Sequence, residues 1–141
     1  MYATRTLAVV VLCASLGACA PAPVALPYTL KDYQQGVARR IVQTSAQTYI
    51  APLPDVMKSI VVLEITVDAA GQATAVSVLR SNGYAHLEQR ALASVAKAAP
   101  FTPPAPALLR GAQSVSFLET FLFRDDDFFQ VRSLVPNEKL F

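Results

Sequence analysis

The sequence predicts an α+β fold, in which a small antiparallel sheet of three strands packs on one face against helices. Residues 60–67, 73–80 and 113–124 are rich in β-branched and aromatic side chains that alternate with polar ones, which predicts strands. Residues 30–50 and 84–99 instead repeat their apolar side chains every three or four positions, which predicts helices. The expected order is helix, strand, strand, helix, strand. A chain of 141 residues that is 53% hydrophobic suits one domain.

The first helix is expected to begin after Thr29. Thr29-Leu30-Lys31-Asp32 has the spacing of a capping box, with Asp32 in place of the usual Glu or Gln. The expected buried stripe recurs at three and four positions and consists of Leu30, Tyr33, Val37, Ile41, Thr44 and Thr48. We expect the prolines of Ala51-Pro52-Leu53-Pro54 to end this helix, because proline lacks an amide donor.

A hairpin is expected next. On the first strand Val61, Leu63, Ile65 and Val67 share one face. Asp68-Ala69-Ala70-Gly71 supplies a turn with a glycine available for positive φ, and Val76 and Val78 then face inward on the second strand.

The second helix follows Asn82-Gly83. Its expected buried face consists of Tyr84, Leu87, Ala91, Val95 and Ala98, and Pro100 is expected to stop it. The stretch PFTPPAPALLRG is expected to be an exposed, extended connection. It leads to the third strand, Gln113 to Arg124, where Glu119 interrupts the apolar face and is expected near the rim of the sheet.

The amino-terminal residues have the layout of a secretory signal. Arg5 is followed by an apolar run from Leu7 to Leu16 and by small residues. Leu16-Gly17-Ala18-Cys19 is similar to the lipobox of bacterial lipoproteins, in which the cysteine is lipidated. An uncleaved membrane anchor and ordinary secretion remain as alternatives.

These features predict four segments. They are a lipoprotein signal peptide (1–18), a short Pro-rich tether (19–28), a folded domain (29–124) and a C-terminal extension (125–141). With Cys19 lipidated, the mature domain has no disulfide. Ala20 after the cysteine favours the outer membrane over the inner one, by resemblance to enterobacterial sorting rules.

Composition argues against several classes of function. The net charge is only +2, without a long basic run, so we expect no nucleic-acid partner. No nucleophile elbow, phosphate-binding loop or two-histidine zinc motif occurs, and His86 is a lone histidine. Asp125 to Asp127 are consecutive and are expected to form a solvated turn, because neighbouring residues do not surround one ion. We therefore expect no catalytic residue, cofactor, metal site or small-molecule substrate.

Several motifs together resemble one family. They are Val67-Asp68-Ala69-Ala70-Gly71, Val76, Val78, Ser81-Asn82-Gly83, Leu87, Ala91, Ala98-Ala99-Pro100-Phe101, Pro103, Pro104 and Phe121-Leu122-Phe123. This series resembles the C-terminal domain of TonB and TolA-like proteins. The resemblance covers Ile60 to Arg124, roughly half of the chain.

The resemblance implies a periplasmic interaction module without catalysis. It implies that the last strand has a free edge, to which an extended segment of an envelope protein adds as a further strand. The candidate edge residues are Gln113, Val115, Phe117, Glu119, Phe121 and Phe123. A protected strand without a partner remains the alternative. Coupling of a proton gradient to transport is not implied, because this chain has a lipobox and a short tether where TonB has an inner-membrane helix and a long spacer.

The extension after Arg124 leaves two alternatives open. Residues 128–135 run back as a fourth strand that covers the edge, or they form a tail whose apolar residues dock on another protein. Two functions are therefore considered: a lipoprotein module that binds an envelope partner reversibly, and a structural lipoprotein subunit of an envelope or secretion assembly.

Overall fold

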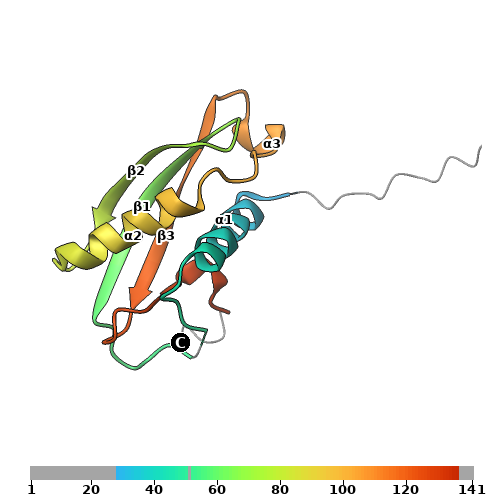
Figure 1. Cartoon of the computed structure of the whole chain (residues 1–141). Helices are drawn as coiled ribbons and strands as arrows, with labels where there is room; N and C mark the ends of the chain where they lie inside the picture. Colours follow the sequence, from blue (N-terminus) through green and yellow to red (C-terminus); the bar gives the residue numbers. More distant parts are fainter. Residues whose placement is uncertain (1–27, 51, 137–141) are drawn as a thin grey trace, which may run out of the picture.

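A computed structural model describes residues 28–50 and 52–136; the predicted signal peptide, Cys19 and the rest of the tether up to residue 27 lie outside them. The elements, in chain order, are α1 (Leu30–Thr44), β1 (Ser59–Asp68), β2 (Ala73–Arg80), α2 (Ala85–Ala98), α3 (Pro106–Leu109), β3 (Ser114–Phe123), β4 (Phe129–Val131) and the 3₁₀ helix η1 (Arg132–Leu134). The strands form one antiparallel sheet in the order β2-β1-β3-β4, so the predicted α+β class is confirmed (Figure 1).

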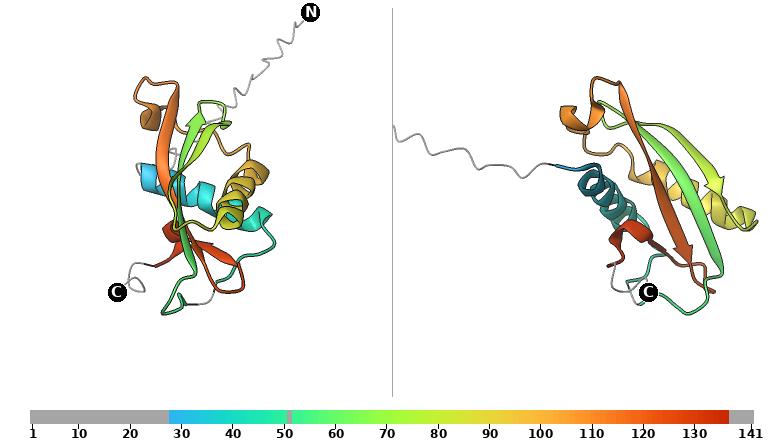
Figure 2. Two further views of the ribbon diagram at one scale, coloured as in Figure 1. Left: turned by 90° about the vertical axis from the view of Figure 1, so that its left-hand side faces the viewer. Right: turned by 180° about the vertical axis from the view of Figure 1, so that it is seen from behind.

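The two longer helices cover one face of the sheet (Figures 1 and 2). α2 packs against β1 and β2, whereas α1 packs against α2, β3, β4 and η1. The core lies between the sheet and these helices; from β1 it receives Val61, Leu63, Ile65 and Val67, all fully buried as the alternation predicts. None of the described helices lies over the opposite face, where Ile60 and Leu118 are 44% and 48% exposed (Figure 2).

The capping box of α1 is confirmed. The Asp32 N–H donates to Thr29 Oγ1 at 3.2 Å, and the Thr29 N–H donates to the Asp32 carboxylate at 2.8 Å. Two other expectations for this helix are wrong: it ends at Thr44, well before the prolines, and Leu30 is exposed.

The early end of α1 has a tertiary cause. Gln47 to Tyr49 leave the helix and run beside β4, where the Phe129 N–H donates to Gln47 O and the Tyr49 N–H donates to Phe129 O, each at 3.1 Å. Thr48 forms an isolated parallel bridge with Phe129 instead of a fourth helical turn. Pairing with β4 therefore replaces helical hydrogen bonds that the apolar period predicted.

The hairpin of β1 and β2 is confirmed, and its turn contacts a distant part of the chain. Gly71 has a φ of 87°, and its carbonyl accepts a hydrogen bond from the Phe101 N–H at 2.8 Å. A Cβ at this position would lie 2.1 Å from the Phe101 carbonyl oxygen. Glycine is therefore required both by the backbone angle and by the close approach.

The second helix is confirmed as α2, with Leu87, Ala91, Val95 and Ala98 buried. Tyr84 is not on this face, because it is the N-cap residue and is 41% exposed. The proline-rich connection is not wholly extended: it contains the one-turn helix α3, with a proline in its first turn.

Candidate functional site

The register between β1 and β3 decides which backbone groups of β3 face outward. Ser59 to Asp68 pair with Phe123 to Ser114 without interruption, and the Ala69 N–H donates to Gln113 O at 3.1 Å. In an antiparallel pair the hydrogen-bonded residues alternate, so Gln113, Val115 and the odd-numbered residues after them direct their backbone groups toward β1. Ser114, Ser116 and Leu118 direct theirs away from it.

The carboxyl end of β3 is closed by the chain itself. Phe121, Leu122 and Phe123 pair with Val131, Gln130 and Phe129 of β4. The Tyr49 hydroxyl also donates to Leu122 O at 3.2 Å. Phe121 and Phe123 are fully buried, so these two residues of the expected edge belong to the interior of the sheet.

Side chains close the middle of the strand. Gln34 Nε2, from α1, donates to the outward carbonyl of Leu118 at 2.5 Å. The outward N–H of Thr120 donates to Glu119 Oε1 at 3.0 Å. What remains open is the outward side of Ser114 to Leu118, where the structure shows no hydrogen bond, within the described residues, to the N–H or C=O groups of Ser114 and Ser116.

The expected edge residues thus lie on the strand that has the open stretch, but they are its odd-numbered residues. Their backbone groups point toward β1 and not toward the open side. Phe117, Glu119, Phe121 and Phe123 are buried beneath the helices and Val115 is half-buried. The exposed backbone groups belong to their even-numbered neighbours. Side-chain alternation alone does not reveal this, because it locates the buried face of a strand and not the direction of its hydrogen bonds.

The expectation that Glu119 lies near the rim of the sheet is wrong, because it is buried in the middle of β3, opposite Leu63. It is 1% exposed, and its carboxylate accepts hydrogen bonds from the Ser133 hydroxyl and from the Ser133 N–H, the latter at 3.3 Å. Burial raises the pKa of Glu119, and the hydrogen bonds from Ser133 and Thr120 partly oppose that rise. The side chain therefore joins β3 to η1 beside the open stretch; a lone acid in an apolar strand face was the only sequence signal of this role.

This burial makes stability depend on pH. Because the pKa of Glu119 is raised above 4.5 in the folded protein, its contribution favours the folded state below that value and is lost as the pH rises through the raised pKa. We expect Glu119→Gln to remove this loss, so that the difference in unfolding free energy between variant and wild type grows in favour of the variant from about pH 4 to about pH 8. Urea unfolding across this range measures it; a constant difference contradicts it.

A groove of about 590 Å³ runs beside the middle of β3; we call it the edge groove. Residues of α1, of the sheet strands β1 and β3 and of the C-terminal segment form it. Its lining consists of Lys31, Gln34 and Gln35 from α1, Val62, Leu118, Glu119 and Thr120 from the sheet, and Arg132, Ser133, Val135 and Pro136 from the C-terminal segment. Gln35 Nε2 also donates to Ser133 O at 3.2 Å, so α1 holds the C-terminal segment in place at the groove.

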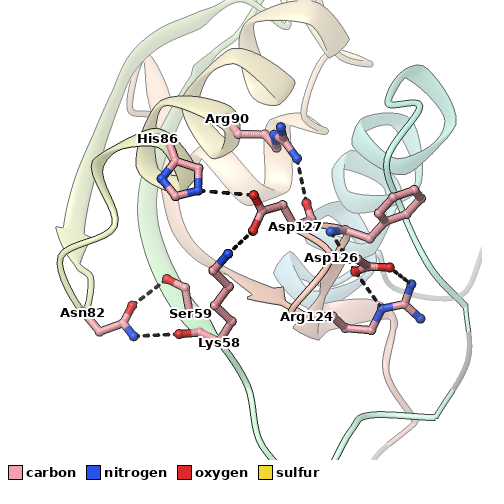
Figure 3. A network of polar contacts seen from close by, with 9 residues as sticks. Lys58, Ser59, Asn82, His86, Arg90, Arg124, Asp126 and Asp127 are labelled. Carbon is pink, nitrogen blue, oxygen red and sulfur yellow. Dashed lines mark hydrogen bonds and ion pairs between the residues drawn. The ribbon is translucent and has the colours of Figure 1, made fainter.

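A second polar cluster fixes the turn between β3 and β4 (Figure 3). Lys58 Nζ lies 2.6 Å from Asp127 Oδ1, His86 Nε2 lies 3.3 Å from Asp127 Oδ2, and Arg90 donates to Asp127 O at 2.8 Å. The hydrogen bond from Lys58 lowers the pKa of Asp127, with His86 contributing less. Arg124 likewise pairs with Asp126 at 2.7 Å. Asp125 and Asp126 are exposed in this turn, as the sequence predicted, whereas Asp127 is half-buried; Asp126 and Asp127 are in addition paired with basic side chains.

The described residues contain no group of three side chains arranged to hold a metal ion. They also contain no helix long and apolar enough to cross a membrane. His86 contacts the carboxylate of Asp127 and the ring of Tyr84. Its contacts therefore support a structural role in the turn.

The described residues form a small α+β domain whose sheet has two unpaired stretches: the outer side of β2, which pairs only with β1, and the outward side of β3 beyond the reach of β4. Residues 57–124, slightly under half of the chain, match the family described as Gram-negative bacterial TonB protein C-terminal. The resemblance predicted from the sequence is thereby confirmed. The family consists of protein-interaction domains of the Gram-negative envelope. Comparison with curated proteins and with solved structures finds no match.

Proposed function

We propose that this chain is a lipid-anchored, periplasm-facing protein whose TonB C-terminal domain binds an extended segment of another envelope protein. The segment adds as a strand beside Ser114 to Leu118, in TonB-type transport or envelope maintenance. The unpaired outward groups of Ser114 and Ser116 support this most directly, because exposed N–H and C=O groups on a sheet edge accept a further strand. The domain acts by binding, without catalysis, cofactor or small-molecule substrate.

Replacing Ser116 tests the pairing. In Ser116→Pro the ring removes an N–H that faces away from β1, so the sheet keeps its ladder and the edge loses a donor. We expect this variant to lose its partner in affinity purification from cross-linked envelopes. Ser116→Ala is the matched control, since it loses only a hydroxyl that bonds to Thr66 at 2.7 Å, and it is expected to retain the partner. Equal recovery with both variants contradicts strand addition.

The membrane attachment rests on the sequence. We propose that the signal peptide is removed before Cys19, that this cysteine carries the lipid, and that the outer membrane is favoured. Metabolic labelling with a fatty acid analogue is expected to label the wild-type chain, and Cys19→Ser is expected to lose the label and to leave the membrane fraction. A labelled, membrane-bound Cys19→Ser chain contradicts lipidation at this residue.

The uncovered face of the sheet favours a second candidate, a structural subunit of an envelope or secretion assembly. Ile60 and Leu118 expose 44% and 48% of their surface there, and a permanent neighbour would bury both. Such a subunit is expected to purify in a stoichiometric complex, whereas the interaction module is expected to purify alone and to bind a peptide reversibly.

A further inference from the structure

We infer that the segment added beside Ser114 to Leu118 is acidic and is selected by three basic side chains that flank this stretch, Lys31, Arg110 and Arg132. This inference rests on the proposed strand addition and names the chemical class of the partner. It follows from where these cations lie, from the absence of ion pairs for them among the described residues, and from how the nearby anions are occupied.

The three cations come from separate elements and are placed along one edge. Lys31, in the first turn of α1, and Arg132, at the start of η1, both line the edge groove with Leu118. Arg110, the left-handed cap residue of α3, lines a second depression with Val115, close to the first residues of β3. All three are exposed, and within residues 28–50 and 52–136 none forms an ion pair.

Among the described residues, the acidic groups nearby form no ion pair with these cations. The Glu119 carboxylate is buried and accepts hydrogen bonds from Ser133 and Thr120. The carboxylate of Asp32 binds the N–H and hydroxyl of Thr29, and that of Asp68 binds the N–H groups of Ala70 and Gln72 in the hairpin turn. Glu64 is exposed opposite Leu118, on the uncovered face of the sheet, and does not line the groove.

An added strand would present alternate side chains to two environments. On one side it meets Val62 and Leu118, which are apolar and incompletely buried. On the other it meets Lys31 and Arg132, with Arg110 at the far end. The complementary segment therefore alternates apolar residues with aspartate or glutamate, and charge pairing of this kind raises the association rate and sets specificity.

A peptide array tests the inference with the full chain as the probe. The array carries nine-residue peptides of random composition, and the bound set is compared with the whole array. We expect the bound peptides to be enriched in aspartate and glutamate. The chain with Lys31→Glu, Arg110→Glu and Arg132→Glu is expected to lose that enrichment and to bind the best acidic peptide at least about tenfold more weakly. The matched control is Arg39→Glu, Arg80→Glu and Lys97→Glu, three exposed cations that do not line the edge groove and whose substitution changes net charge equally.

Peptide binding by the different variants distinguishes the selection of acidic segments from the proposed strand addition. Bound peptides that are lost in Ser116→Pro but are neutral or basic overturn the acidic selection and leave strand addition standing. Acidic peptides that Ser116→Pro still binds overturn pairing at this edge. Equal weakening in the two triple variants assigns the effect to net charge and overturns the assignment to these three residues. If removal of residues 137–141 makes neutral peptides bind as well as acidic ones, the terminal segment sets the selection and the inference fails.

Discussion

Phe129→Ala is expected to lower the free energy of unfolding by about 3–5 kcal/mol, which is a large share of the stability of a domain of this size. Phe129 is 1% exposed, and its ring centroid lies 5.1 Å from that of Phe121 and 5.6 Å from that of Phe123. Truncation leaves a cavity between these rings and removes the packing that attaches β4 to the core. Urea unfolding measures the change.

The adjacent Phe128 provides the control. Its side chain is only partly buried in the turn, with the Arg124 guanidinium 5.7 Å from its ring centroid. Phe128→Ala is therefore expected to change stability by about 1 kcal/mol or less. Equal losses of unfolding free energy in the two variants would contradict the specific contribution of the buried Phe129 ring.

Release of β4 would also free the outward groups of Leu122. Partner binding per folded molecule is therefore expected to increase in Phe129→Ala.

Gly71→Ala is expected to lower the free energy of unfolding by about 3 kcal/mol or more. The substitution imposes a φ of 87° on a residue with a side chain, and it places the new Cβ 2.1 Å from the Phe101 carbonyl oxygen. Since that oxygen belongs to the backbone, the hairpin turn and the chain around Phe101 must separate. The hydrogen bond from the Phe101 N–H to Gly71 O is then lost as well.

Gly83→Ala separates the cost of a positive φ from the cost of the close contact with Phe101. Gly83 has a similar φ of 94°, but nothing lies within 4 Å of the position that its Cβ would take. Backbone strain alone then predicts a loss of about 1 kcal/mol. Urea unfolding measures the loss of unfolding free energy in both variants. Equal losses would show that the hairpin turn accommodates the new Cβ of Gly71→Ala without displacing Phe101.

Most of the sheet and both longer helices followed from local pattern. β1 and α2 are predicted well because Val61 and Leu87, like their neighbours at the same period, are buried for the reason that the period suggests. The end of α1 is predicted badly because Thr48 fits the helical period and yet pairs with Phe129, more than 80 residues away in the chain. The sequence around Thr48 contains no signal that pairing with a distant strand will replace a further helical turn.

The sequence predicted which strand carries the candidate site, but not which of its backbone groups are exposed. Resemblance pointed to β3, and the extension was expected to pair with β3 or to leave it free. The structure combines the two outcomes, because Phe121 to Phe123 are paired and Ser114 to Leu118 are open. Lys31, Gln34 and Arg132 were not expected beside this strand, since their placement depends on how α1 and η1 pack.

The shortness of the open stretch limits how long any added strand would stay bound. Among the hydrogen bonds of the described residues, none pairs the outward groups of Ser114 and Ser116 or the N–H of Leu118, whereas Gln34 donates to the Leu118 carbonyl. Few backbone bonds imply a brief residence time at one copy. Many copies crowded on one membrane would give a multivalent partner high avidity from individually weak encounters.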